Sequence, residues 1–145
     1  MNITSPSFNN GESVPSTYTC DGGNINPPLQ FSEVPKEAKS LALIVDDPDA
    51  PVGTWFHWVM WNIKPETTEI RENVPPAEAT QGMTSFGKTG YGGPCPPSGQ
   101  HHYHFKLYAL DTELNLSQAT DAEALENAMM GHILEQAELV GTYER

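Results

Sequence analysis

The chain has 145 residues, enough for one domain that buries roughly two-thirds of the surface exposed by its unfolded chain. Its formal net charge is −12, with 19 acidic and only seven basic side chains, which are scattered along the sequence. Because clustered basic side chains bind phosphate backbones and anionic lipid surfaces, we expect neither nucleic-acid binding nor stable membrane association. No composition break or linker divides the sequence, so we predict a single domain over residues 1–145.

The N-terminus and the cysteines bear on the cellular compartment. Residues 1–6 have neither the basic start nor the apolar stretch of a secretory signal, and no run is long enough to span a bilayer. A cytoplasmic protein is therefore expected. Cys20 and Cys95 are too few for a disulfide scaffold, so we expect free thiols in a reducing compartment. Both flank Pro or Gly turns, which leaves a bridge between them as the less favoured alternative.

Strand signals dominate the chain. Turn clusters divide the first forty residues and leave room only for short β segments, which indicates edge strands and loops laid over a sheet. Residues 41–45 form a continuous apolar run, and residues 56–63 form a second run rich in aromatic and β-forming side chains, so we predict two buried neighbouring strands. Residues 101–110 alternate with the period of a strand. One predicted face carries His101, Tyr103, Phe105 and Leu107, and the other His102, His104, Lys106 and Tyr108.

The end of the chain predicts one helix and one strand. Residues 120–123 have the form of a capping box, in which Thr120 would cap the helix. Leu125, Met129 and Ile133 then fall on one helical stripe, which indicates an amphipathic helix. Residues 139–143 are predicted to form a short terminal strand.

Two Pro-rich turns each precede a histidine at the start of an apolar run. Residues 46–51 (DDPDAP) precede His57, and residues 92–97 (GGPCPP) precede His101. Proline restricts its own φ and the residue before it, so such turns hold polar side chains with little entropy left to lose on binding. The pattern predicts a small, preformed pocket.

Four segments stand out together: residues 18–22 with 27–29, 47–51 with 57–58, 90–97 with 101–103, and 137–143. In this order they resemble the phosphatidylethanolamine-binding protein family, specifically its bacterial Raf-kinase-inhibitor-like branch. The resemblance covers most of the chain. It implies a mainly β fold, an antiparallel β-sandwich with Greek-key-type connections and a C-terminal α-helix.

The resemblance also implies a small pocket that accepts phosphate, phosphoryl head groups or similar anions. The loop at residues 98–100 is shorter than in many relatives, and His102 stands where an arginine is common. The family's pocket positions correspond here to Asp47, Asp49, Pro51, His57, Pro96, His101 and Tyr103.

Carboxylates beside an anion site require a compensating partner, because like charges repel strongly in a low dielectric. We expect Asp47 to accept a hydrogen bond from His57 or His101 and to favour the imidazolium, which donates to the anion together with the Tyr103 hydroxyl. On this hypothesis anion affinity falls as the pH rises through roughly 6 to 8. Asp46 is expected only to form the turn.

Three classes of function remain open on the sequence alone. The leading hypothesis is a non-catalytic pocket for a small anion or a phosphorylated protein, by which a kinase or protease partner is regulated. Phosphatidylethanolamine itself is not expected as the native ligand, because no apolar groove for acyl chains is evident. The second class is a hydrolase that uses Ser98 or Tyr103, or an enzyme that holds a metal with His57, His101 and Asp47.

The sequence weighs against the enzyme, since it contains neither a Gly-x-Ser-x-Gly elbow nor an HExxH motif, and we expect no cofactor and no metal. The third class is an assembly protein with a vestigial pocket. Both a monomer and a homodimer are compatible with the sequence.

Overall fold

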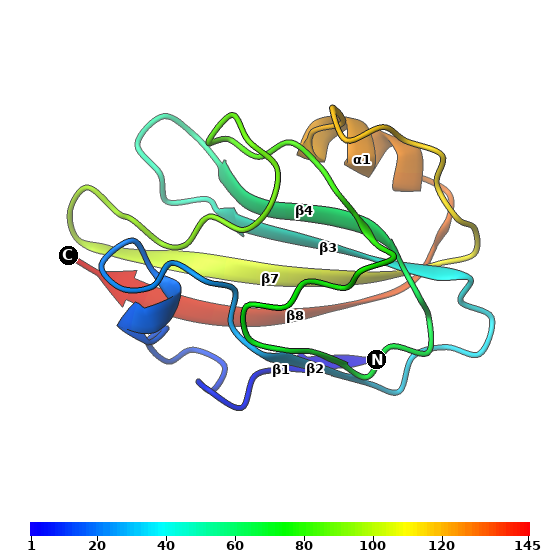
Figure 1. The fold of residues 1–145 in the computed structure, drawn as a ribbon, viewed down its shortest axis with the longest axis horizontal. Coiled ribbons are helices and arrows are strands. Elements are labelled where there is room, and N and C mark those ends of the chain that lie inside the picture. The colour runs from blue at the N-terminus through cyan, green and yellow to red at the C-terminus, as the bar shows by residue number, and fades with distance from the viewer.

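Two antiparallel sheets pack face to face, and one helix covers the outer side of the larger sheet (Figure 1). The computed structural model describes residues 1–145. The smaller sheet has the order β1-β2-β5, built from β1 (Asn2–Thr4), β2 (Leu29–Ser32) and β5 (Glu69–Ile70). The larger has the order β6-β4-β3-β7-β8, built from β3 (Ser40–Asp47), β4 (Trp55–Ile63), β6 (Thr80–Gln81), β7 (Gln100–Leu110) and β8 (Ile133–Glu144). The predicted mainly β sandwich is confirmed.

The core lies between the two sheets. Nineteen buried side chains, most of them from the two sheets, form one cluster that includes Leu29 and Phe31 of β2 and Leu43 and Val45 of β3. A second cluster of nine buried residues lies on the outer face of the larger sheet, beneath the helix α1 (Ala122–Met129). Strand β3 is therefore buried on both faces, which explains its continuous apolar run.

Strand β7 has the predicted alternation. His101, Tyr103, Phe105 and Leu107 are buried toward the core, and each intervening residue is more exposed. The strand pairs antiparallel with β3 on one side and β8 on the other, with Asp46 opposite His104. This register brings the end of β3 beside the beginning of β7.

The C-terminal segment differs from the prediction. The helix is capped by Asp121, whose Oδ1 accepts from the Ala124 amide at 3.0 Å, and not by Thr120. It ends at Met129, and Gly131, at a φ of +84°, turns the chain away. Ile133 is therefore not on the helical stripe but begins β8, which has twelve residues where only 139–143 were predicted as strand.

The chain reverses direction between β3 and β4, and β7 begins at the same end of the larger sheet. The turn at residues 48–54 and the loop at residues 91–99 therefore meet at one end of the sandwich, on the left of Figure 1. The 3₁₀ helix η1 (Ser16–Tyr18) and the C-terminus lie at this end too. The one α-helix, with eight residues, does not meet the length and hydropathy needed to cross a membrane.

Candidate functional site: a pocket at the end of the larger sheet

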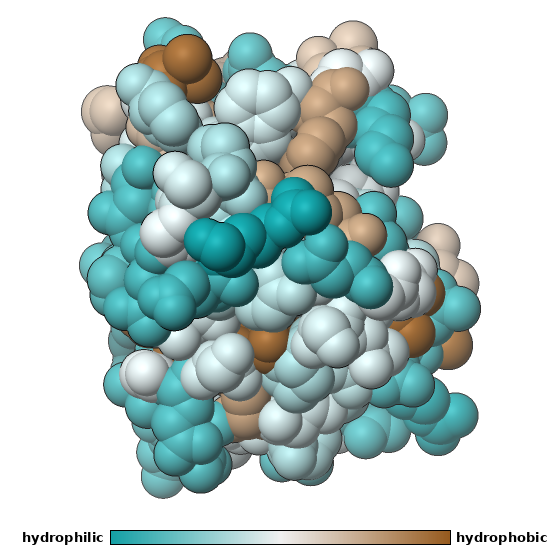
Figure 2. Space-filling model, turned by 90° about the vertical axis from the view of Figure 1, so that its left-hand side faces the viewer, coloured by the Kyte–Doolittle hydropathy of each residue, from teal (hydrophilic) through white to brown (hydrophobic).

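A cavity of about 320 Å³ opens at this end of the molecule. Twelve residues line it, from the β3–β4 turn and the start of β4, from residues 95–97, from the start of β7, and from Phe86. Figure 2 shows the face of the protein that carries these loops, where isolated apolar patches lie among polar side chains. The cavity is at the small end of the range for ligand pockets, about 300–1,000 Å³.

The structure brings together six of the seven pocket residues that the sequence predicted. Those that line the cavity are Asp47, Pro51, His57, Pro96, His101 and Tyr103.

Asp49 does not line the cavity. Its Oδ2 accepts hydrogen bonds from the backbone amide and from Nδ1 of His102, both at 2.8 Å. The hydrogen bond from the His102 side chain is the largest cause of a lowered pKa at Asp49. Asp49 therefore ties the β3–β4 turn to the outer face of β7.

Sequence reasoning missed several residues of the lining, among them Trp55, Phe86 and Cys95. Cys95 lies inside the Pro-rich motif that pointed to the pocket, so its place in that motif was a usable signal. Phe86 comes from a loop with no such motif, and the Trp55 and His57 rings pack against it edge-on. Only the path of that loop across the sheet brings Phe86 to the pocket.

A buried pair of Asp47 and His101 forms the polar side of the pocket. The Asp47 Oδ2 and His101 Nδ1 atoms are 2.6 Å apart, and the two side chains are only 5% and 8% exposed. Asp47 Oδ1 accepts a further bond from the Asp49 amide at 2.8 Å, which orients the carboxylate. Of the two partners that the sequence left open for Asp47, the structure has His101.

His57 is held differently. Its Nδ1 lies 2.7 Å from the carbonyl oxygen of Gly92, which only accepts, so Nδ1 carries the hydrogen. Burial is the main cause of a lowered pKa at His57, and it outweighs the bonds to the Gly92 and Gly93 backbone and the nearby Asp47. A neutral ring follows, and the expectation of an imidazolium is wrong for His57.

Tyr103 supplies a hydroxyl with no partner in the chain. The residue is 1% exposed, and its Oη makes no hydrogen bond. Burial raises the pKa of this phenol well above its usual value, so it is a neutral donor. The ring packs edge-on against His57, with centroids 5.2 Å apart, and parallel to His101 at 6.5 Å. A buried, unpaired hydroxyl costs stability unless a group from outside the chain accepts its hydrogen.

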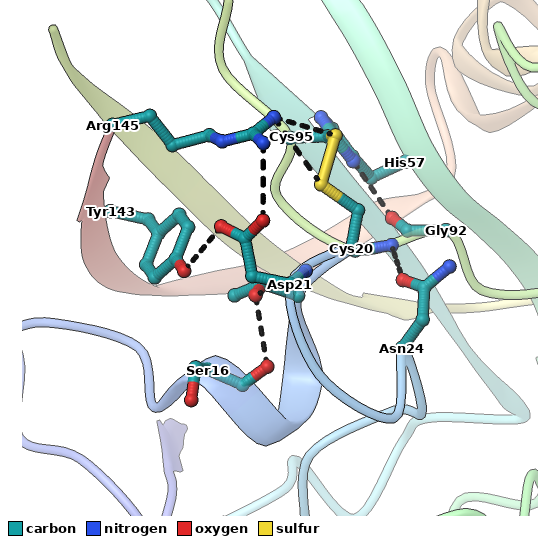
Figure 3. The surroundings of a disulfide bond; sticks show 11 residues. Ser16, Cys20, Asp21, Asn24, His57, Gly92, Cys95, Tyr143 and Arg145 are labelled. Atoms are coloured by element: carbon teal, nitrogen blue, oxygen red, sulfur yellow. Dashed lines mark hydrogen bonds and ion pairs between the residues drawn. A yellow bond between two sulfur atoms is a disulfide. The ribbon is translucent and has the colours of Figure 1, made fainter. Parts of the chain in front are cut away.

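A disulfide joins Cys20 to Cys95 (Figure 3). Cys95 lines the cavity, so the bridge ties the pocket wall to the loop at residues 16–26. The two segments already lie together, because the Cys20 amide donates to the Pro94 carbonyl at 3.1 Å. Arg145 covers the bridge, with Nη1 at 3.5 Å from Cys95 Sγ and Nη2 at 3.2 Å from Asp21 Oδ1. The expectation of free thiols is wrong, and cysteine usage no longer argues for a reducing compartment.

The enzyme alternative requires either a hydroxyl with a base beside it or a set of metal ligands. Ser98 does not line the cavity. The unpartnered Tyr103 hydroxyl has no histidine bonded to it that could act as its base. Asp47 is engaged by His101, and His57, His101 and Asp47 do not form a cluster suited to holding a metal ion.

The lowered pKa of His57 predicts a pH dependence of stability. Above about pH 6.5 the ring is neutral in both the folded and unfolded chain, and the full stability is present. As the pH falls below 6.5 the unfolded chain takes up a proton that the buried ring resists, so stability is lost. Urea unfolding between pH 7.5 and 5 is expected to show a steeper loss for the wild type than for His57→Gln. Parallel curves would contradict a buried neutral ring.

Comparisons with known proteins agree with this architecture. The family model described as phosphatidylethanolamine-binding protein matches residues 4–144. A protein of Methanothermobacter thermautotrophicus named only as a UPF0098 protein is 53% identical, with 100% of this chain and 99% of that protein covered. A UPF0098 protein of Pyrococcus horikoshii is 52% identical over 95% of this chain and 74% of its own length.

Two solved structures have closely similar folds. One is described as a homologue of phosphatidylethanolamine-binding protein from Chlamydia trachomatis; its TM-score is 0.96 at 45% identity, with 99% of this chain and 97% of that chain covered. The other is Escherichia coli YbcL, described as a member of the mammalian family, with a TM-score of 0.93 at 33% identity and coverage of 99% and 98%.

Proposed function

Since the chain belongs to the phosphatidylethanolamine-binding protein family, we propose that it is a non-catalytic binding protein whose pocket takes a small oxyanion such as a phosphate ester. The ester is carried by a small molecule or by a phosphorylated partner protein. Regulation of a kinase or protease partner by this protein, through its pocket, belongs to the proposal. Family membership supports the pocket, and the chemistry of the site supports the ligand class.

The observation that carries the proposal is the unpartnered Tyr103 hydroxyl. It lies in a pocket beside the Asp47–His101 pair, where a ligand oxygen can accept its hydrogen. A donor kept buried without a partner costs about 1–3 kcal/mol, which a bound acceptor recovers. Ligand binding is therefore favoured at this atom over any exposed hydroxyl of the chain.

The mouth of the pocket suits a ligand with an apolar body. Half of the twelve lining residues are apolar, and Val52 at the rim is 84% exposed while Phe86 is 39% exposed. An ester with an organic substituent buries these side chains, whereas bare phosphate does not. Phenyl phosphate is therefore the probe of choice.

The test is the Tyr103→Phe variant, which removes only the hydroxyl. Without ligand we expect the variant to be as stable as the wild type or about 1 kcal/mol more stable, because an unsatisfied buried group is gone. Phenyl phosphate at a hundred times its dissociation constant should stabilise the wild type by about 2.7 kcal/mol, a rise of several degrees in Tm, and should stabilise the variant much less. Thermal unfolding at pH 6 with and without the probe measures both effects.

The matched control is Tyr108→Phe, because Tyr108 lies on the opposite face of the same strand. It should keep the full ligand-induced shift. Equal shifts in wild type and Tyr103→Phe, or no shift in the wild type at any concentration reached, would end the proposal of an oxyanion pocket.

A further inference from the structure

The pocket has an unusual charge balance for an anion site. None of its twelve lining residues is Lys or Arg, and its only acidic side chain is Asp47, which is paired with His101. The lining therefore offers no Lys or Arg side chain to an anion. A multiply charged anion would be desolvated there without a cationic side chain to compensate it, which disfavours fully ionised ligands.

His57 presents a hydrogen-bond acceptor to this pocket. Its Nδ1–H donates to the Gly92 carbonyl at 2.7 Å, so the neutral ring has its lone pair on Nε2. The ring lies between Phe86 and Tyr103, both packed edge-on, with centroids 5.3 and 5.2 Å away. No group of the chain donates to Nε2, so a ligand that displaces solvent from it must itself carry a hydrogen to satisfy it.

The opposite requirement comes from β7. The Tyr103 hydroxyl is buried without a partner in the chain and needs an acceptor. A ligand that fits the pocket must thus accept a hydrogen bond from Tyr103 and donate one to His57. A fully ionised oxyanion has only acceptors and would set its lone pairs against that of His57.

We propose that the pocket selects oxyanions that keep a proton: the monoanion of a phosphate monoester donates its P–OH to His57 Nε2, while its ionised oxygens accept from Tyr103. Sulfate esters of the same shape are rejected because they have no such proton. This inference rests on the proposed function and names the ligand class of the same site. His57 becomes the residue that determines specificity.

The expected discrimination follows from one unsatisfied acceptor in a buried site. An unpaired buried acceptor costs about 1–3 kcal/mol, so phenyl sulfate should bind wild type on the order of 10- to 100-fold more weakly than phenyl phosphate. The two probes share a phenyl ring and an ester oxygen, so apolar contacts cancel in the ratio. Calorimetry at pH 6, near the second pKa of a phosphate ester at about 6, measures both dissociation constants.

The variant His57→Gln measures how much of this discrimination is due to the His57 side chain. A glutamine amide near the position of Nε2 turns either its oxygen or its NH₂ toward the ligand. We therefore expect the ratio of the two dissociation constants to fall to about 1, chiefly because phenyl sulfate binds more tightly. The wild-type ratio stands by itself if the variant fails to fold.

The pH dependence shows where the proton resides. The ionisable groups near His57 come from two strands: Asp46 and Asp47 from β3, and His101 and Tyr103 from β7. The segment before Cys95 adds no ionisable group, because it contacts His57 through the Phe86 ring and the Gly92 backbone. If the proton is on the ligand, the pH at which affinity is halved rises when phenylphosphonate, the weaker acid, replaces phenyl phosphate. If affinity is halved at the same pH for both ligands, the proton is on a protein side chain, and the inference is overturned.

The outcomes separate the two proposals. Phenyl sulfate binding to wild type as tightly as phenyl phosphate would overturn the selection for a protonated ligand and leave the oxyanion pocket standing. If neither probe binds, the proposed function itself falls. Discrimination of 10-fold or more that His57→Gln abolishes supports both.

Discussion

Replacing Cys20 and Cys95 together with serine is expected to lower the free energy of unfolding by about 4 kcal/mol. The bridge closes a loop of 75 residues, and in the chain-entropy model the unfolded chain gains most freedom when such a long loop is released. Urea unfolding of the oxidised wild type and of the double variant measures the difference.

Reduced wild type is the control for this experiment, since it has the native side chains but no bridge. It should lose as much stability as the double variant, and a thiol assay should find no free thiol before reduction and two after it. Loss of less than about 1 kcal/mol in both, or two free thiols in unreduced protein, would show that the bridge does not form or does not stabilise the fold.

Gly93→Ala is expected to cost about 3 kcal/mol and to weaken ligand binding. A Cβ at this position would lie 2.2 Å from the Tyr18 carbonyl oxygen and 2.9 Å from the Thr19 Cα, both of them backbone atoms. Relief of this overlap moves the loop and breaks the 2.8 Å bond from the Gly93 amide to Asn24 Oδ1. The neighbouring Gly92 carbonyl, which holds His57, moves with it.

The matched control is Gly23→Ala on the facing loop. There the new Cβ would come no closer than 3.4 Å to the Thr17 carbonyl oxygen, an ordinary contact, so we expect a change within about 1 kcal/mol. Urea unfolding and phenyl phosphate affinity of both variants should be compared. If Gly93→Ala behaves like Gly23→Ala in both measurements, the close packing of the two loops is not needed for the pocket.

These two predictions concern one structural unit, the disulfide and loop contacts behind the pocket. The Tyr91 hydroxyl donates to the Tyr18 carbonyl at 2.7 Å, and the Gly93 amide donates to Asn24 Oδ1 at 2.8 Å, so hydrogen bonds join the loop at residues 16–26 to the segment that leads into the pocket wall. The Tyr143 hydroxyl, which donates to Asp21 at 2.7 Å, joins the same loop to β8 (Figure 3). Because this loop holds residues 92–97 in place, the pocket is formed before any ligand arrives. Preformed donors and acceptors are what a selective site requires.

Much of the fold could be predicted from local patterns. The apolar run at residues 41–45 became part of β3, and the alternation at residues 101–110 became β7 with the expected buried face. The Pro-rich turns pointed to the end of the sandwich where the cavity lies. Local prediction failed at Ile133, because an apolar residue at helical spacing also fits an exposed position at the start of a strand.

The sequence by itself determined the strand periods, the two turn motifs and the histidines that follow them, because each is a property of a few neighbouring residues. Only the tertiary structure decided that Asp47 pairs with His101, that His57 is neutral against the Gly92 carbonyl, and that Cys20 is bonded to Cys95. These depend on where loops from distant parts of the chain cross. Burial and the distance to a partner set protonation and bonding there, and neither is encoded in spacing along the chain.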